Sequence, residues 1–299
     1  MIDFFIGLIL ALVMFSIGLS LKTDDFRRLF ASPRVLFLGL CIQLMLLPVL
    51  AFGAGWLLGL PPAFATGVVV LAACPGGLTS NFISFLLKAN TTLAVSLTIC
   101  NTTLSMLTIP FIVNIGLNTF WTGGGLQQLP VVPTAVKIFL IVLVPIMLGM
   151  SCRVRRRELA GYLQPKLRWL SILLLGLLFG LKLLAPKSAG GSDLLLAEVT
   201  VILPASLLVN ITALSSGWFF GRLLGFGRND QITLGVEAGI QNTSLAFLIT
   251  STLLDNEQML KPALVYAMFT FFTGLGYGLW LKPGMWNTLR KEWRTFNFF

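Results

Sequence analysis

Residues 74–81 have the sequence CPGGLTSN and lie in the middle of an apolar stretch, residues 62–87, that is long enough to cross a membrane. Proline removes a backbone donor, two glycines have low helix propensity, and Ser and Asn are typical N-capping residues. The stretch therefore predicts a helix that ends near Cys74 and begins again near Leu78.

A second interruption is predicted in the other half of the chain. Residues 237–244 have the sequence EAGIQNTS and lie within the apolar stretch 229–254, where the carboxylate of Glu237 directly precedes the break. Non-helical backbone at mid-membrane depth is tolerated only where it is buried in protein or lines a cavity. Two interruptions at matching depths are typical of inverted-repeat transporters, which bind their substrate where the repeats meet.

The composition agrees with a membrane protein. Of the 299 residues, 56% are hydrophobic and only 11% are charged, whereas soluble domains have about 25% charged residues. The chain has no histidine, which excludes His-dependent nucleophiles and His-ligated zinc or haem, and its four cysteines show no CxxC spacing. We therefore expect no enzyme activity and no organic cofactor. We also expect the protein to be embedded in the lipid bilayer.

Apolar stretches predict an all-α polytopic fold of nine transmembrane helices, with no separate soluble domain. The predicted spans are residues 2–21, 34–58, 62–87, 90–118, 132–152, 165–185, 195–224, 229–254 and 258–281. Residues 2–21 lack a basic n-region and a convincing cleavage site, so they are predicted to be a helix of the mature protein and not a signal peptide.

The basic residues predict the orientation in the membrane. Nine spans place 17 of the 21 Lys and Arg residues on one side: Lys22, Arg27, Arg28, Arg34, Lys88, Arg153, Arg155, Arg156, Arg157, Lys166, Arg168, Arg222, Arg228, Lys282, Arg290, Lys291 and Arg294. Basic loops stay in the cytoplasm, so we expect an inner or plasma membrane protein with its N-terminus outside and its C-terminus cytoplasmic. The same distribution explains the net charge of +10 without a nucleic-acid partner.

Three lysines are predicted to lie near the outer side of the membrane. Lys137 and Lys182 are expected to extend their ammonium groups to the interface, and Lys261 is expected in an outer loop.

Glu237 is the one acidic residue predicted to lie deep in a span, where a charge costs about 2.5–3.5 kcal/mol on the insertion scale. A functional carboxylate is favoured over a structural one because Glu237 adjoins a predicted break. Hard cations such as Na⁺ prefer oxygen ligands. Neutral side-chain oxygens are available at the breaks and in neighbouring spans, on Ser80, Asn81, Gln241, Asn242, Gln43, Thr98 and Asn101. These features favour Na⁺ over a proton as the bound cation.

At these residues the chain resembles the bile acid:sodium symporter family, whose bacterial members pair a CPGG-x-x-SN stretch with a later E-x-G-x-QN stretch. Residues 74–81 and 237–242 match both, and residues 18–26 also look like the family. The resemblance covers nearly the whole chain and implies a nine-helix form. It implies a panel of helices at about 2–21 and 132–185, and a core at about 34–118 and 195–281, in which the two interrupted helices cross.

The resemblance also implies two Na⁺ sites. The first would use Ser80, Asn81, Thr98 and Glu237; the second would use Gln43, Glu237, Gln241 and the carbonyls of Ala238 and Ile240. Two positions depart from relatives. Ala94 stands where the first site can have a serine, and Thr270-Phe271 stands where some relatives have a His-Asn pair.

The expected function is Na⁺-coupled symport of an organic anion, a bile acid-like steroid conjugate, by alternating access. We expect the substrate to contact Gly77, Thr79, Asn242, Thr243 and Thr270. A Na⁺-coupled carrier of small carboxylates such as pyruvate or pantoate is an alternative, and an ion channel lined by Glu237 is a more remote one. No feature of the sequence points to an obligatory protein partner.

Overall fold

The computed structural model describes residues 2–21, 32–121, 128–186 and 190–295, and the regular structure within these ranges is helical. Among these residues, six helices are long and apolar enough to cross a membrane, and three shorter apolar helices accompany them. Predictions for Lys22, Asp25, Phe26, Arg27 and Arg28 concern residues outside these ranges.

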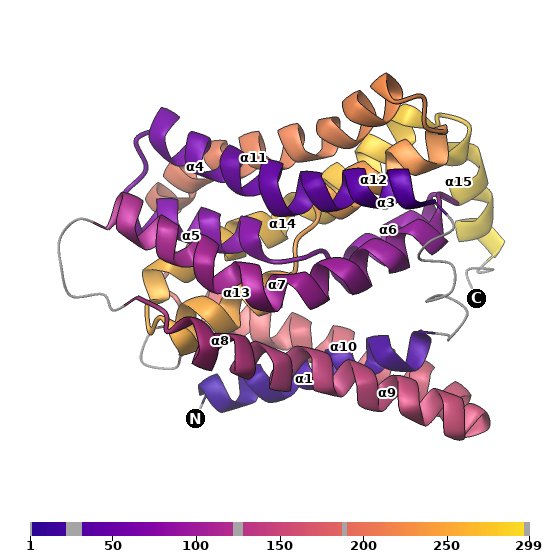
Figure 1. Ribbon diagram of the computed structural model, residues 1–299, viewed down its shortest axis with the longest axis horizontal. Helices are drawn as coiled ribbons and strands as arrows, with labels where there is room; N and C mark the ends of the chain where they lie inside the picture. The colour runs from indigo at the N-terminus through magenta and orange to yellow at the C-terminus, as the bar shows by residue number, and fades with distance from the viewer. Residues whose placement is uncertain (1, 22–31, 122–127, 187–189, 296–299) are drawn as a thin grey trace.

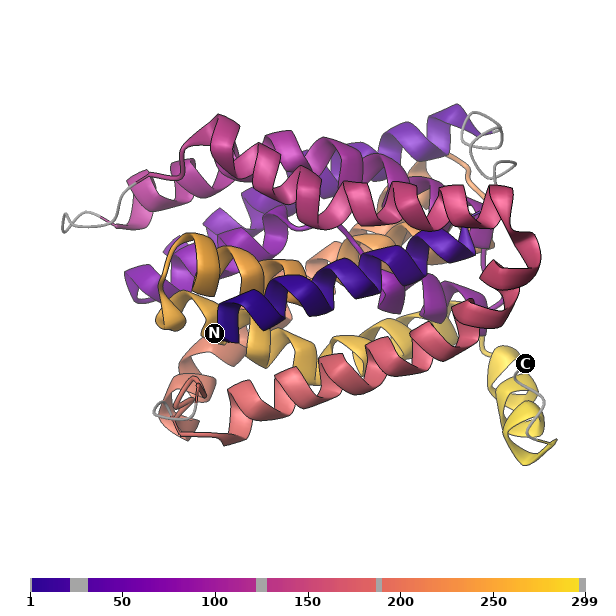
Figure 2. The same ribbon diagram turned by 90° about the horizontal axis from the view of Figure 1, so that it is seen from below.

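Helices α1, α8, α9 and α10 form what we call the small layer, which lies along the bottom of Figure 1. Its elements are α1 (Ile2–Ser20), α8 (Val131–Ile138), the π-helical turn η2 (Phe139–Leu143), α9 (Val144–Arg155) and α10 (Arg157–Leu184). Helices α1 and α9 approach closely because Gly18 and Gly149 have no side chain. A Cβ on Gly18 would meet the Ile146 carbonyl, and a Cβ on Gly149 would meet the Phe15 carbonyl. Figure 2 shows α1 running between α9 and α10.

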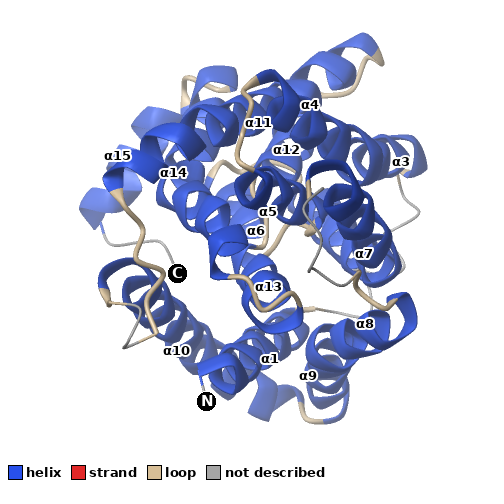
Figure 3. Cartoon of the chain, turned by 90° about the vertical axis from the view of Figure 1, so that its left-hand side faces the viewer, coloured by secondary structure: helices blue, strands red, loops and turns tan. Residues whose placement is uncertain are grey.

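The remaining membrane helices form the large layer, seen end-on in Figure 3. Its elements are α3 (Pro33–Cys41), η1 (Ile42–Leu46), α4 (Leu47–Leu57), α5 (Pro62–Ala73), α6 (Leu78–Leu86), α7 (Thr91–Phe120), α11 (Leu196–Leu223), α12 (Arg228–Gly239), α13 (Thr243–Phe247), η4 (Leu248–Leu253) and α14 (Glu257–Leu281). Helices α11 and α12 pack so closely that a Cβ on Gly217 would overlap the backbone of Gly235. Small residues at such contacts are typical of membrane helix packing.

The π-helical turns η1 and η2 each end two positions before a proline, Pro48 and Pro145. A proline inside a helix removes one backbone hydrogen bond and clashes with the preceding turn. A wider turn relieves this clash, and π-helical turns are frequent at functional sites. Through η1, this adjustment positions Gln43.

Both predicted interruptions are confirmed. Helix α5 ends at Ala73 and α6 begins at Leu78, while α12 ends at Gly239 and α13 begins at Thr243. The two breaks contact each other through an antiparallel bridge between Gly76 and Gln241, and Asn242 N donates to the Pro75 carbonyl oxygen at 2.8 Å. Part of the backbone left without a helical partner at each break is therefore paired by the other break.

An additional helix, α15 (Met285–Thr295), follows the last predicted span. Met285 and Leu289 are buried beside Tyr277 and Leu281 of α14, so the start of α15 is fixed to the large layer.

Two lysine assignments from the sequence are wrong. Lys182 does not extend to the interface, because it is almost fully buried and bonded to Glu257, and Lys261 lies within α14 and is bonded to Glu198. The position of each lysine in the sequence does not show which carboxylate it meets. A carboxylate from another helix makes burial of the ammonium tolerable, and such a partner is not visible in the local sequence.

Candidate cation and substrate site

Glu237 lies two residues before the end of α12 and is 2% exposed. Thr98 of α7 donates its hydroxyl to Glu237 Oε2 at 3.1 Å, and Asn81 of α6 donates Nδ2 to Thr98 Oγ1 at 2.9 Å. A Cβ on Gly76 would lie 2.8 Å from Glu237 Oε2 and 3.1 Å from Ser80 Oγ, so these two oxygens flank the first break. The four side chains of the first predicted site are therefore together.

Three residues of the second predicted site, Gln43, Gln241 and Ala238, form a hydrogen-bonded group. Gln43 donates Nε2 to Gln241 Oε1 at 2.8 Å and to the Cys74 carbonyl oxygen at 2.9 Å. Gln241 in turn donates Nε2 to the Ala238 carbonyl oxygen at 2.6 Å. Ile240 has extended backbone at the end of α12. Gln43 thus connects η1 to both breaks.

Several buried oxygens in this region have no hydrogen-bond partner among the described residues: Glu237 Oε1, Gln43 Oε1, Asn81 Oδ1 and Asn101 Oδ1. Buried polar atoms are normally paired, and an exception needs an explanation. All four atoms are acceptors, and one belongs to a carboxylate, which is the donor set that a hard monovalent cation prefers. The residues present fit Na⁺.

The predicted substrate residues divide into two groups. Gly77, Thr79, Asn242 and Thr243 lie at the meeting of the breaks, where the side chain of Asn242 is 3.7 Å from a Cβ position on Gly77. Asn242 Oδ1 accepts from Leu245 N at 3.1 Å and so caps α13. Thr270 of α14 is buried and donates its hydroxyl to the Gly239 carbonyl oxygen at 3.2 Å. A role in substrate binding remains a prediction for all five.

Asn210 of α11 and Tyr266 of α14 are not among the site residues predicted from the sequence. Both donate to the Gly239 carbonyl oxygen, each at 2.7 Å, and together with Thr270 they satisfy the last carbonyl of α12. The available signal was Asn210 itself, a lone amide in the apolar stretch 195–224. These contacts support the end of the helix that carries Glu237.

Two cavities between the layers reach this site. One has a volume of about 290 Å³ and is lined by Asn81, Thr98 and, from the small layer, Leu21 and Met150. The other, of about 240 Å³, is lined by Asn81 and also by Gln164 near the start of α10. The candidate cation site therefore opens toward the end of the molecule where α1 ends and α10 begins.

The sequence signature of the Sodium Bile acid symporter family matches residues 7–185, more than half of the chain. The chain belongs to this family. Members described in other organisms are similar along most of the chain. A probable sodium/metabolite cotransporter of Oryza sativa, BASS2, is 31% identical over 260 residues, which is 86% of this chain and 58% of that protein.

Two further relatives of the family extend the comparison. The probable sodium/metabolite cotransporter BASS1 of Arabidopsis thaliana is 26% identical over 91% of this chain and 66% of its own length, so the chain spans about three fifths to two thirds of the plant proteins. The uncharacterized sodium-dependent transporter YocS of Bacillus subtilis is 29% identical over 82% of this chain and 73% of that protein.

Proposed function

We propose that this protein is a secondary active transporter in which Na⁺ moving inward drives the uptake of an organic anion, a bile acid-like steroid conjugate. The observation that carries the proposal is the position of Glu237. It is a buried carboxylate with an unpartnered oxygen, at the point where two helix breaks meet, in a member of this family. An intramembrane carboxylate is by default functional.

Two Na⁺ ions share Glu237 in this proposal. The first is held by Ser80, Asn81, Thr98 and Glu237, and the second by Gln43, Glu237, Gln241 and the carbonyls of Ala238 and Ile240. The pairing of Thr98 with Glu237 and of Gln43 with Gln241 supports both groupings. Two cations neutralise one carboxylate and one anionic substrate, which binds near Gly77, Thr79, Asn242 and Thr243.

Transport then requires the two layers to move relative to each other. In the proposed arrangement of nine spans and inverted repeats, the small layer is the panel and the large layer is the core. The N-terminus is outside and the C-terminus is cytoplasmic. Na⁺ favours the conformation that it binds more tightly and so makes the substrate site available.

A small carboxylate such as pyruvate or pantoate is the second candidate substrate. The cavities beside Asn81, of about 240 and 290 Å³, fall below the usual range of about 300–1,000 Å³ for ligand pockets. Their small volume favours a small carboxylate over a steroid conjugate. The plant relatives are named sodium/metabolite cotransporters, and this supports the same alternative.

Uptake into proteoliposomes tests the proposal. We expect labelled taurocholate to accumulate when an inward Na⁺ gradient is applied and not under an equal K⁺ gradient. Pyruvate and pantoate are assayed in parallel as labelled substrates. Empty liposomes are the control. Failure of every anion to show Na⁺-dependent uptake by folded protein would contradict the proposal, and flux that neither saturates nor couples to Na⁺ would indicate a channel.

Replacing Gln241 by alanine is expected to raise the Na⁺ concentration for half-maximal uptake at least about tenfold, the lower end of the loss seen when groups around a metal are changed. The variant removes the partner of Gln43 and the bond to Ala238. A Na⁺ titration of uptake measures the effect, with Gln258→Ala as a matched control because Gln258 is exposed at the start of α14. An unchanged titration would contradict the second site.

A further inference from the structure

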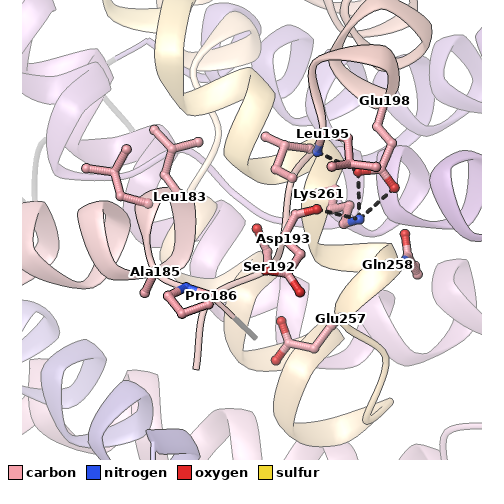
Figure 4. A pocket seen from close by; sticks show the side chains of 12 residues that line it. Leu183, Ala185, Pro186, Ser192, Asp193, Leu195, Glu198, Glu257, Gln258 and Lys261 are labelled. Carbon is pink, nitrogen blue, oxygen red and sulfur yellow. Dashed lines mark hydrogen bonds and ion pairs between the residues drawn. The ribbon is translucent and has the colours of Figure 1, made fainter. Parts of the chain in front are cut away.

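Two ion pairs, each with a buried lysine and a partly exposed glutamate, lie at the end of the molecule where α10 ends and α14 begins. Lys182 Nζ is 2.7 Å from Glu257 Oε1, and Lys261 Nζ is 2.6 Å from Glu198 Oε1. Figure 4 shows the recess at this end, of about 710 Å³, with Lys261 bonded to Glu198 and with Glu257 on its wall.

The two pairs differ in what they join. Lys261 lies on α14 and Glu198 on α11, so both ends of this pair belong to the large layer. Lys182 lies on α10 of the small layer and Glu257 on α14 of the large layer, so this pair connects the layers. Only the second pair has to break when the layers separate at this end.

Apolar packing closes the same end. Ile6 and Leu10 of α1 belong to one buried cluster with Leu245 and Leu248 of the large layer. The cavities beside Asn81 lie at the opposite end, where α1 ends and α10 begins. The layers are therefore packed together at the end that holds Lys182. At the opposite end two cavities lie between them, beside a contact between the Arg168 guanidinium of α10 and the Phe82 ring of α6.

The surroundings of Lys182 and Glu257 suit a contact that forms and breaks. Lys182 is 2% exposed, so its ammonium depends on Glu257 while the layers are closed. The side chain of Glu257 is 34% exposed and lines the recess, so water reaches the pair from this side as the layers begin to part. Removing Glu257 would leave the buried ammonium of Lys182 without a counter-charge, which is strongly destabilising.

We propose that the Lys182–Glu257 pair is a latch that holds the two layers closed at this end, which the distribution of basic residues assigns to the outside. The inference rests on the proposed function, since it assigns a positioning role in alternating access to two residues that bind neither Na⁺ nor substrate. The Lys261–Glu198 pair has no such role, because it lies within one layer.

Thiol labelling tests the latch without transport. Leu248 is 1% exposed and packs against α1, where a Cβ on Gly7 would lie 3.9 Å from Leu248 Cδ1. A Leu248→Cys reporter should therefore react with a maleimide only when this end opens. In detergent, Lys182→Met is expected to raise the labelling rate at least about tenfold, because the closed state loses its buried pair. The protein without the reporter gives the background from the native cysteines.

The matched control is Lys261→Met, which removes an equally buried lysine and is expected to leave the labelling rate within about twofold. Charge reversal at both positions, Lys182→Glu with Glu257→Lys, should restore slow labelling, and it keeps the test available if Lys182→Met does not fold. Equal rates in Lys182→Met and the parent, or an equal rise in Lys261→Met, would overturn the latch. Because the readout needs no substrate, missing Na⁺-driven uptake would count against the proposed function and not against the latch.

Discussion

Replacing Glu237 by glutamine is expected to lower Na⁺-driven uptake at least about 100-fold, since even groups outside the direct ligands change metal affinity 10–100-fold. Among the described acidic residues, Glu237 is the one that is buried. The amide has nearly the shape of the carboxylate and can still accept the hydrogen bond from Thr98. The variant therefore removes the charge that balances the cations and leaves the packing of α12 unchanged.

Thermal unfolding separates loss of the ion from loss of the fold. Na⁺ should raise the unfolding temperature of the parent protein, because a ligand that binds only the folded state stabilises it, and should not raise that of Glu237→Gln. Without Na⁺ the variant is expected to be at least as stable as the parent, since it no longer buries a carboxylate.

The control is Glu158→Gln, which removes an exposed carboxylate at the start of α10. It should leave both uptake and Na⁺ stabilisation unchanged. Na⁺-driven uptake that persists in Glu237→Gln would remove Glu237 from both sites.

The interruptions could be predicted from the sequence because their causes are local. Pro75 and the two glycines after it break the helix whatever surrounds them, and the observed ends, Ala73 and Leu78, lie at or next to the predicted ones. The burial of Glu237 could be predicted for a similar reason, since this residue lies within the apolar stretch 229–254. The additional helix α15 lies beyond the last apolar stretch, so a search for membrane spans could not find it.

Contacts between distant helices could not be predicted from the residues. Gln43 and Gln241 are 198 positions apart, and their grouping came only from the family resemblance. No resemblance suggested that Lys182 would meet Glu257 or that Asn210 would reach the Gly239 carbonyl. Hydropathy gives the depth of a side chain in the membrane but not which helices are neighbours, and that arrangement decides which polar groups meet.

Replacing Gly76 by alanine is the second variant with a large expected effect. The added Cβ would lie 2.8 Å from Glu237 Oε2, 3.1 Å from Ser80 Oγ and 3.3 Å from the Glu237 carbonyl oxygen. The methyl group must therefore displace the carboxylate or the first break. Overpacking of this kind costs about 1–3 kcal/mol, which corresponds to roughly 5- to 150-fold in a binding constant. We expect the Na⁺ concentration for half-maximal stabilisation to rise within that range.

The neighbouring glycine provides the matched comparison. A Cβ on Gly77 meets nothing closer than the side chain of Asn242 at 3.7 Å, and the backbone there is extended, with φ of −147°. Gly77→Ala should therefore leave the Na⁺ titration of the unfolding temperature unchanged, although it adds a methyl group where the substrate is proposed to bind. The two variants make the same chemical change one residue apart. A Na⁺ affinity that falls equally in both would mean that the break needs glycine for its backbone, and the close approach of Gly76 to Glu237 would then not explain the effect.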